Sequence, residues 1–408
     1  MLAGCGRLSF DDHRDGGNKD ASSQLDAGAA PCNAITKLAD DFATDRRATL
    51  WQRSYTDDTS SIAIANHQVT LNISVNAANS YVGLVSSMYY DLRGHRVFAG
   101  LVHPGNPKTT GGLGVGIDKA TLAHVVVENG VLIAVREINA DYQQVATEPY
   151  DPIADRYLAL EERAGRLYWE TSPDAVTFTS FYDEPAPFDL SLVETYVYAG
   201  LSIANADPGT AVFDSFNGGV AIASPACKAA TLVDTFDATN ALWHNSFADA
   251  CCSDTETNGE VVLGTNGKSG FAGLRSSAGY DLRDSQIFTA TKGPQQMTTM
   301  YGLLGAEIDV NNYIAFELDS AGYTCETFAA GVLHQDMAVR MAGDAYARLR
   351  EAGGTIFYEA SADATTWRTL ASRPTPFDVS DVYVGVEIGN ATDSNSANAV
   401  AYDGFNAP

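Results

Sequence analysis

Basic residues are scarce in this sequence. Lys and Arg together number 25, against 51 Asp and Glu, and the formal net charge is −26. Binding to the phosphate backbone of a nucleic acid requires a positive surface, which this charge balance opposes. We therefore expect no nucleic-acid partner.

Long apolar runs and several common catalytic motifs are also missing. No run of eighteen apolar residues occurs, so the sequence predicts no membrane-spanning helix. The seven histidines are scattered without metal-ligand spacing, and neither a His-Glu-x-x-His motif nor a Gly-x-Ser-x-Gly elbow is present. Zinc proteases and serine hydrolases of these kinds are therefore not expected.

An internal repeat is the strongest positive feature of the sequence. A chain of 408 residues is longer than one hydrophobic core supports, so two or three domains are expected. Residues 167–175 match residues 356–364, and both copies close on an aromatic-Asp-x-Phe-Asn string at 213–217 and 402–406. We predict three parts, namely a lipobox-like start with an acidic linker (1–32), a first domain (33–226) and a second domain (227–408).

The local patterns within each copy predict short strands. Residues 355–359 are β-branched and aromatic, residues 361–364 read as a turn whose Asp363 bonds its own backbone, and residues 365–367 begin the return strand. Residues 382–388 alternate as a strand does when one face packs on a core. The pattern predicts an all-β fold of two tandem antiparallel β-sandwich domains.

Several strings in both copies resemble the concanavalin A-like lectin and glucanase superfamily, which includes laminin G-like domains. They are Asp40-Asp41-Phe42 with Trp51, residues 302–318, the set Ser361, Asp363 and Trp367, and Val384-Gly385-Val386. The resemblance implies a jelly-roll fold. It does not imply one activity, since the superfamily includes lectins, glycan-binding modules, glycosidases and adhesion domains.

The family-16-like glucanases of this superfamily carry a strand motif of Glu-x-Asp-x-x-Glu. Glu307 and Asp309 match its beginning, and the alternation of a strand places them on one face, but Asn312 stands where the last Glu is expected. The first copy has Gly116 in place of Glu307. Because hydrolysis by this route requires two carboxyl groups, we predict a non-catalytic protein, with Glu307 and Asp309 as the residual candidates.

Four aspartates at the ends of the copies are candidate calcium ligands. Asp41 and Asp234 open the copies, while Asp214 and Asp403 close them, and the first and last strands of a sandwich can be neighbours. The alternative is that these side chains only accept hydrogen bonds from backbone amides. We predict no cofactor other than this possible structural calcium.

Aromatic side chains in a concave groove would stack on sugar rings. Trp51 and Trp243 are expected in the core instead. Spacing singles out none of the remaining candidates, which are Tyr89, Tyr142, Tyr150, Tyr301 and Tyr323.

The cysteines suggest an exported protein. Residues 2–5, Leu-Ala-Gly-Cys, resemble the lipobox of bacterial lipoproteins, which implies lipidation of Cys5. The acidic segment that follows has no apolar pattern and reads as a flexible stalk. Export makes disulfides plausible.

Two disulfide pairings are predicted. Cys32 precedes the first strand of copy one and Cys227 follows its last strand, which favours a Cys32–Cys227 bond because these ends run side by side in the resembled fold. The alternative pairs Cys227 locally with Cys251 or Cys252. Cys325 then needs one of these two, and we predict Cys252–Cys325.

These observations favour a lipid-anchored protein of the bacterial cell envelope or extracellular space. Its paired lectin-like domains are expected to bind a glycan or another surface component, and its only membrane contact is expected through the anchor. The alternatives are a structural or adhesive protein that binds cell-surface proteins and, third, a glycoside hydrolase.

Overall fold

The computed structural model describes most of the chain from Cys32 onward. No described helix is long and apolar enough to cross a membrane. Residues 1–31, which include Cys5, lie outside the described residues, so the lipidation of Cys5 stays a prediction. The described residues are 32–52, 54–56, 60–73, 80–106, 108–201, 209–238, 241–243, 246–292, 300–318, 322–390, 393 and 397–407.

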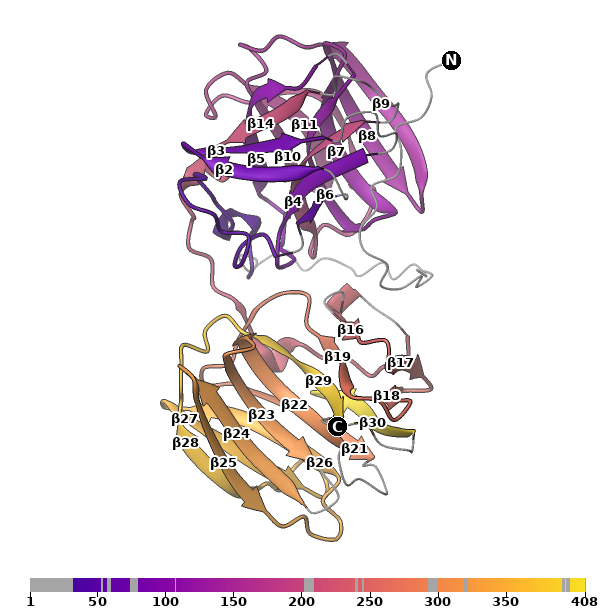
Figure 1. Cartoon of the computed structure of the whole chain (residues 1–408), viewed down its shortest axis with the longest axis vertical. Coiled ribbons are helices and arrows are strands. Elements are labelled where there is room, and N and C mark those ends of the chain that lie inside the picture. The colour runs from indigo at the N-terminus through magenta and orange to yellow at the C-terminus, as the bar shows by residue number, and fades with distance from the viewer. Residues whose placement is uncertain are drawn as a thin grey trace. The chain divides into compact units, whose positions relative to one another are not determined.

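The described chain divides into two compact units, with the boundary between Ser224 and Pro225. Each unit contains two seven-stranded sheets, and every strand pair within these sheets is antiparallel. The two layers of each unit are visible in Figure 1. The predicted all-β fold of two antiparallel β-sandwich (jelly-roll) domains is confirmed.

The first domain consists of a front sheet, in the order β1-β4-β13-β6-β7-β8-β9, and a back sheet, in the order β12-β11-β10-β5-β14-β3-β2. The front strands are β1 (Tyr55–Thr56), β4 (Ser80–Val85), β6 (Thr110–Asp118), β7 (Thr121–Glu128), β8 (Val131–Ile138), β9 (Asp141–Pro149) and β13 (Glu194–Leu201). The back strands are β2 (Ser61–Ala65), β3 (Gln68–Asn72), β5 (Arg96–Pro104), β10 (Tyr157–Arg163), β11 (Arg166–Ser172), β12 (Thr179–Pro185) and β14 (Thr210–Asp214).

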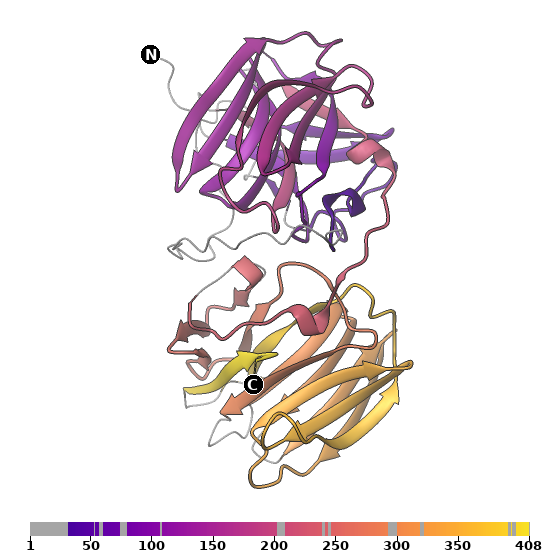
Figure 2. The same cartoon turned by 180° about the vertical axis from the view of Figure 1, so that it is seen from behind.

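The second domain repeats this layout, with a front sheet β16-β19-β29-β22-β23-β24-β25 and a back sheet β17-β18-β30-β21-β26-β27-β28. The front strands are β16 (Phe247–Ala248), β19 (Gly270–Arg275), β22 (Met300–Asp309), β23 (Asn312–Leu318), β24 (Tyr323–Ala329), β25 (Val332–Ala338) and β29 (Tyr383–Asn390). The back strands are β17 (Cys252–Thr257), β18 (Glu260–Thr265), β21 (Gln286–Lys292), β26 (Tyr346–Ala352), β27 (Thr355–Ser361), β28 (Arg368–Pro374) and β30 (Asn398–Phe405). In Figure 2 the C-terminal strand β30 is the yellow arrow beside the label C, and it pairs with β18 and β21.

Short elements complete the two domains. β15 and β20 form a small parallel pair. These elements are β15 (Cys227–Lys228), β20 (Tyr280–Asp281) and the 3-10 helices η1 (Ile35–Lys37), η2 (Asn217–Gly219), η3 (Ala229–Thr231) and η4 (Ala241–Trp243).

Turn chemistry connects the strands as the sequence predicts. β27 and β28 form the expected hairpin, and the Asp363 carboxylate accepts the N–H groups of Thr365 and Thr366 at 2.9 and 2.7 Å. Because these two residues serve the turn, the return strand begins at Arg368 and not at residue 365. Asn129 and Gly130 join β7 to β8 with positive φ angles of 53° and 71°, as a two-residue hairpin turn requires.

The same buried contact anchors the core of each copy. The Trp51 indole N–H donates to the Asp40 carboxylate at 2.7 Å, and the Trp243 indole N–H donates to Asp234 in the second copy. Both tryptophans are buried, as predicted. The Asp40 carboxylate also accepts a hydrogen bond from the Phe42 N–H. These hydrogen bonds offset the cost of burying the carboxylate.

Candidate functional site

A groove of about 560 Å³ lies on the front sheet of the second domain. It occupies the face that points away from the core, because the intervening residues of the same strands, such as Leu304, Val386 and Phe316, are buried, and Phe316 contacts Tyr358 of the back sheet. Strands β19, β29, β22, β23 and β24 supply most of its lining, and β16 with the residue Asp249 just after it contributes to one end. The lining includes Asp249, Arg275, Tyr301, Leu303, Gly305, Glu307, Tyr313, Glu317, Glu326, Tyr383, Gly385 and Glu387.

Glycines form the floor of this groove. Gly385 on β29 lies opposite both Arg275 on β19 and Gly305 on β22. A Cβ atom on Gly385 would lie 2.1 Å from the carbonyl oxygen of Leu274, so no other residue fits there without a backbone shift. The low floor leaves space between the larger side chains on either side.

An ion pair crosses the middle strand of the site. The Arg275 guanidinium binds the Glu307 carboxylate, although β29 separates their strands. Gly385 carries no side chain at the crossing point, and the Arg275 guanidinium lies 5.3 Å from the ring centre of Tyr383. This contact places a positive charge directly beside the Glu307 carboxylate.

Glu387 lies in the same groove and has a raised pKa. Burial and, to a smaller extent, the charge of Glu307 raise the pKa of Glu387, Arg275 partly opposes both effects, and the resulting pKa is about 7. The groove thus holds one carboxylate paired with a cation and one carboxyl group that is substantially protonated at neutral pH.

Two more carboxylates line the far side of the groove. Glu317 on β23 lies opposite Leu303, which lies opposite Glu387 on its other side. Glu326 on β24 accepts a hydrogen bond from the Gln335 side chain. Burial raises the pKa of Glu326, while hydrogen bonds from Gln335 and Tyr313 oppose that rise.

Asp309, the second predicted catalytic candidate, does not line this groove with Glu307. A β-bulge between Glu307 and Asp309 interrupts the pairing of β22 with β23, so the expected alternation fails at this point. The Asp309 carboxylate is exposed and accepts the Asn311 N–H at 2.7 Å and the Asn312 side-chain amide at 3.0 Å. Asp309 and Asn312 therefore sit at the two strand ends that flank the turn between β22 and β23.

Tyrosines fill the equivalent face of the first domain. Tyr196 and Tyr198 on β13 are buried in an apolar cluster that also contains Tyr81 and Val126. Their rings lie over glycines, since a Cβ on Gly114 would come within 2.3 Å of the Tyr196 ring. The register places Tyr196 where Gly385 stands in the second copy and Tyr198 where Glu387 stands.

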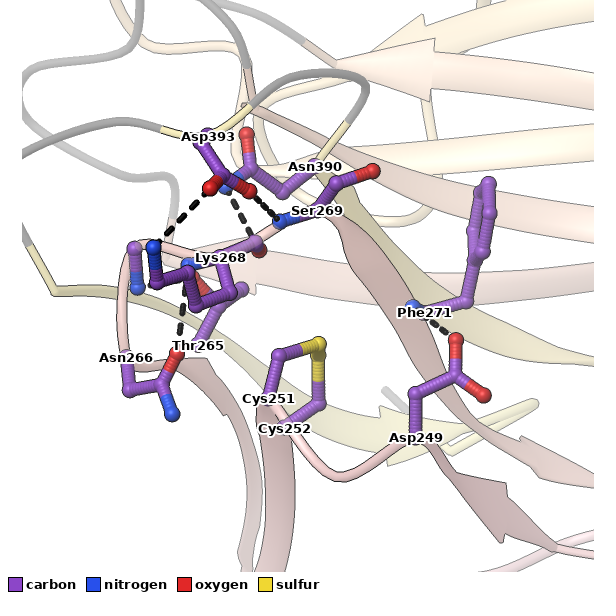
Figure 3. The surroundings of a disulfide bond; sticks show 11 residues. Asp249, Cys251, Cys252, Thr265, Asn266, Lys268, Ser269, Phe271, Asn390 and Asp393 are labelled. Atoms are coloured by element: carbon purple, nitrogen blue, oxygen red, sulfur yellow. Dashed lines mark hydrogen bonds and ion pairs between the residues drawn. A yellow bond between two sulfur atoms is a disulfide. The ribbon is translucent and has the colours of Figure 1, made fainter.

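A disulfide between adjacent residues lies near one end of the second-domain groove. Cys251 is bonded to Cys252, and Figure 3 shows this vicinal disulfide beside Asp249 and Phe271. The Cys252 N–H donates to the Asp249 carbonyl at 2.8 Å, and the Phe271 N–H donates to the Asp249 carboxylate at 2.9 Å. Asp249 and Phe271 line the groove, so the vicinal disulfide is hydrogen-bonded directly to a residue of the groove wall.

The predicted Cys252–Cys325 bond is wrong. The vicinal disulfide leaves Cys325 without a partner, and Cys325 is a buried free thiol on β24 whose pKa burial raises to about 12. Cys32 and Cys227 are each disulfide-bonded. The predicted bond between these two stays a prediction.

The four candidate calcium ligands have other partners. Asp234 is buried against the Trp243 indole, Asp214 pairs with Arg156 at 2.6 Å, Asp403 lies 3.6 Å from Lys292, and Asp41 accepts the Ala43 N–H at 3.0 Å. Among the described residues no group of three or more His, Cys, Asp or Glu side chains is placed to hold a metal ion. The calcium prediction gains no support from this part of the chain.

The tyrosines named as candidates for stacking on sugar rings differ in how deeply they are buried. Tyr301 lines the second-domain groove. Tyr89 and Tyr323 are core residues, each 1% exposed. Tyr142 and Tyr150 are partly buried against the apolar clusters of the first domain.

No protein-family model matches the chain, and no curated protein matches it. Solved structures with the same fold do match. A prokaryotic β-1,3-1,4-glucanase (lichenase) from a mouse hindgut metagenome shares 10% identity over 43% of this chain and 96% of its own, with a TM-score of 0.34.

Two further solved structures are similar to the same extent. A family 16 endo-glucanase from Bacteroides ovatus shares 10% identity over 43% of this chain and 98% of its own, with a TM-score of 0.33. The kappa-carrageenase from Pseudoalteromonas carrageenovora shares 9% identity over 42% and 91%, with a TM-score of 0.32. These neighbours are carbohydrate-active jelly-roll proteins.

The expectation that the chain is not an enzyme is corrected by these findings. The structures it matches include glycoside hydrolases of family 16, although at low identity and over less than half of the chain. The expectation rested on the missing last Glu of a linear motif. It overlooked that a second carboxylate can come from a neighbouring strand.

Glu387 and Arg275 are the site residues that the sequence analysis missed. The alternation in residues 382–388 predicts a strand, and β29 confirms it, but no sequence motif marks Glu387 on the outward-facing side of that strand. The repeat contained a signal for them. Where the first copy has Tyr196 and Tyr198, the second has Gly385 and Glu387. This change replaces two large aromatic rings with a glycine and a carboxyl group.

Proposed function

We propose that the groove of the second domain is the active site of a glycoside hydrolase that cleaves a glycan chain. The observation that carries the proposal is the pair Glu307 and Glu387. They belong to the neighbouring strands β22 and β29 and line one groove, in which Glu307 is paired with Arg275 and the pKa of Glu387 is raised by burial.

Glycosidic cleavage needs this division of roles. One carboxylic acid protonates the leaving oxygen, and one ionised carboxylate acts as the nucleophile or as the base that activates water. Glu387, with its raised pKa, is assigned as the acid. Glu307, paired with Arg275, is assigned as the ionised carboxylate, and Tyr301 and Tyr313 offer aromatic surface to sugar rings.

The test is release of reducing ends from a panel of polysaccharides by the full-length chain. Glu307→Gln and Glu387→Gln are each expected to lower the rate by on the order of 100-fold or more. Asp309→Asn is the matched control, since it removes a carboxylate from the same strand outside the groove, and it is expected to stay active.

The pH dependence supplies a second readout. Because the acid must be protonated, the rate is expected to fall as pH rises through about 7, the pKa of Glu387. Release of no reducing ends from any glycan, or full activity in both glutamine variants, would overturn the proposal.

We propose separately that Cys5 is lipidated and holds the chain at a bacterial cell envelope. This rests on the lipobox-like residues 2–5 alone. Incorporation of a labelled fatty acid in a bacterial host, lost in Cys5→Ala, is the expected result. Equal incorporation in the variant would contradict it.

A further inference from the structure

The second-domain groove is strongly acidic. Among its described lining residues, five carry carboxyl groups and Arg275 is the one basic side chain. Arg275 is already paired with Glu307. The acidic lining residues are Asp249, Glu307, Glu317, Glu326 and Glu387.

These carboxyl groups lie on both sides of the floor. Glu387 and Glu317 lie opposite Leu303 from the two neighbouring strands, β29 and β23. Neighbouring strands are about 4.8 Å apart, so a ligand group above Leu303 lies within roughly 5 Å, measured across the sheet, of the strand on either side. Glu326 continues the acidic side on β24, opposite Ala315.

We infer that the groove accepts glycans without anionic groups and rejects sulfated and uronic glycans; this inference rests on the proposed function. Carboxylates accept hydrogen bonds from sugar hydroxyl groups, which an uncharged glycan supplies along its length. A sulfate or carboxylate on the ligand finds one cation in the described lining, Arg275, which is already paired with Glu307, and above Leu303 it lies beside the Glu317 carboxylate. Each anionic group above the floor is expected to weaken binding on the order of tenfold at low salt.

The experiment uses glycan pairs that share a backbone and differ only in charge. Laminarin is paired with sulfated laminarin, and hydroxyethylcellulose with carboxymethylcellulose, in affinity electrophoresis and reducing-end assays of the full-length chain. The expected result is retention or cleavage of a neutral member and at least tenfold weaker action on its anionic partner. Raising the salt concentration is expected to narrow the difference.

Variants separate groove charge from total charge. Glu317→Gln combined with Glu326→Gln is expected to reduce the discrimination within a pair. The control is Asp254→Asn combined with Asp403→Asn, which removes two carboxylates from the back-sheet strands β17 and β30. It is expected to leave the discrimination unchanged, and thermal unfolding confirms that each variant is folded.

The outcomes distinguish this inference from the proposed function. Action on an anionic glycan equal to or better than on its neutral partner, lost in Glu307→Gln, would overturn the inference and leave the hydrolase proposal standing. Equal loss of discrimination in the control variant would also overturn it. If no glycan of either kind is bound or cleaved, both fail.

Discussion

Replacing Glu387 by Gln should stabilise the second domain while it abolishes activity. A rise in the pKa of Glu387 from 4.5 to about 7 means that the folded state binds this proton more tightly than the unfolded state does. Stability therefore falls as pH rises from about 4.5 to about 7 and is level above that range. The penalty at pH 8 amounts to at most about 3 kcal/mol.

Gln has the shape of the acid but does not ionise, so Glu387→Gln removes this penalty. For a domain of this size 1 kcal/mol moves the melting temperature by roughly 2–4 °C, so the variant should melt up to about 6–12 °C higher at pH 8 and within error of the parent at pH 4. Differential scanning calorimetry across pH 4–8 measures the difference. Hydrogen exchange of β29 assigns the transition to the second domain.

Glu359→Gln is a control that is expected to change stability in the opposite direction. Burial alone would raise the pKa of Glu359, but hydrogen bonds and charge from Arg350 and Arg348 lower it below its ordinary value. That contribution is present above about pH 4.5 and is lost as pH falls, so this variant should be less stable than the parent at pH 7. A Glu387→Gln protein no more stable than the parent at pH 8 would refute our account of the groove.

Three further predictions follow from the packing. Tyr196→Ala should lower the stability of the first domain by about 3–5 kcal/mol without affecting action on glycans, whereas Tyr313→Ala should weaken glycan binding with little loss of stability. Asp234→Ala should cost about 1–3 kcal/mol in denaturant unfolding because the Trp243 N–H loses its buried acceptor, while exposed Asp41→Ala should cost little. Dithiothreitol reduction of the vicinal disulfide should speed hydrogen exchange around Asp249 and slow cleavage, and a nonreduced peptide map without the Cys251–Cys252 bond would contradict this.

Much of the fold followed from local chemistry in the sequence. Alternation in residues 382–388, the Asp363 turn and the repeated Asp-x-Phe and Trp strings each report on a few neighbouring residues, and the structure places each as expected. The duplication strengthens the fold prediction, because two copies that keep the same buried Asp and Trp are expected to share the same core. These features depend on short-range hydrogen bonds and on the period of a strand, which a sequence displays directly.

The candidate site depended on contacts that only the tertiary structure decides. Glu307 was visible as part of a linear motif, but Asp309 was misplaced because a bulge changed its direction. Glu387 and Arg275 come from strands far from Glu307 in the chain, and sheet pairing alone brings the three side chains into one groove. The same pairing lets Tyr196 and Tyr198 fill that face in the first copy, since an open or a closed groove depends on which side chains meet across strands.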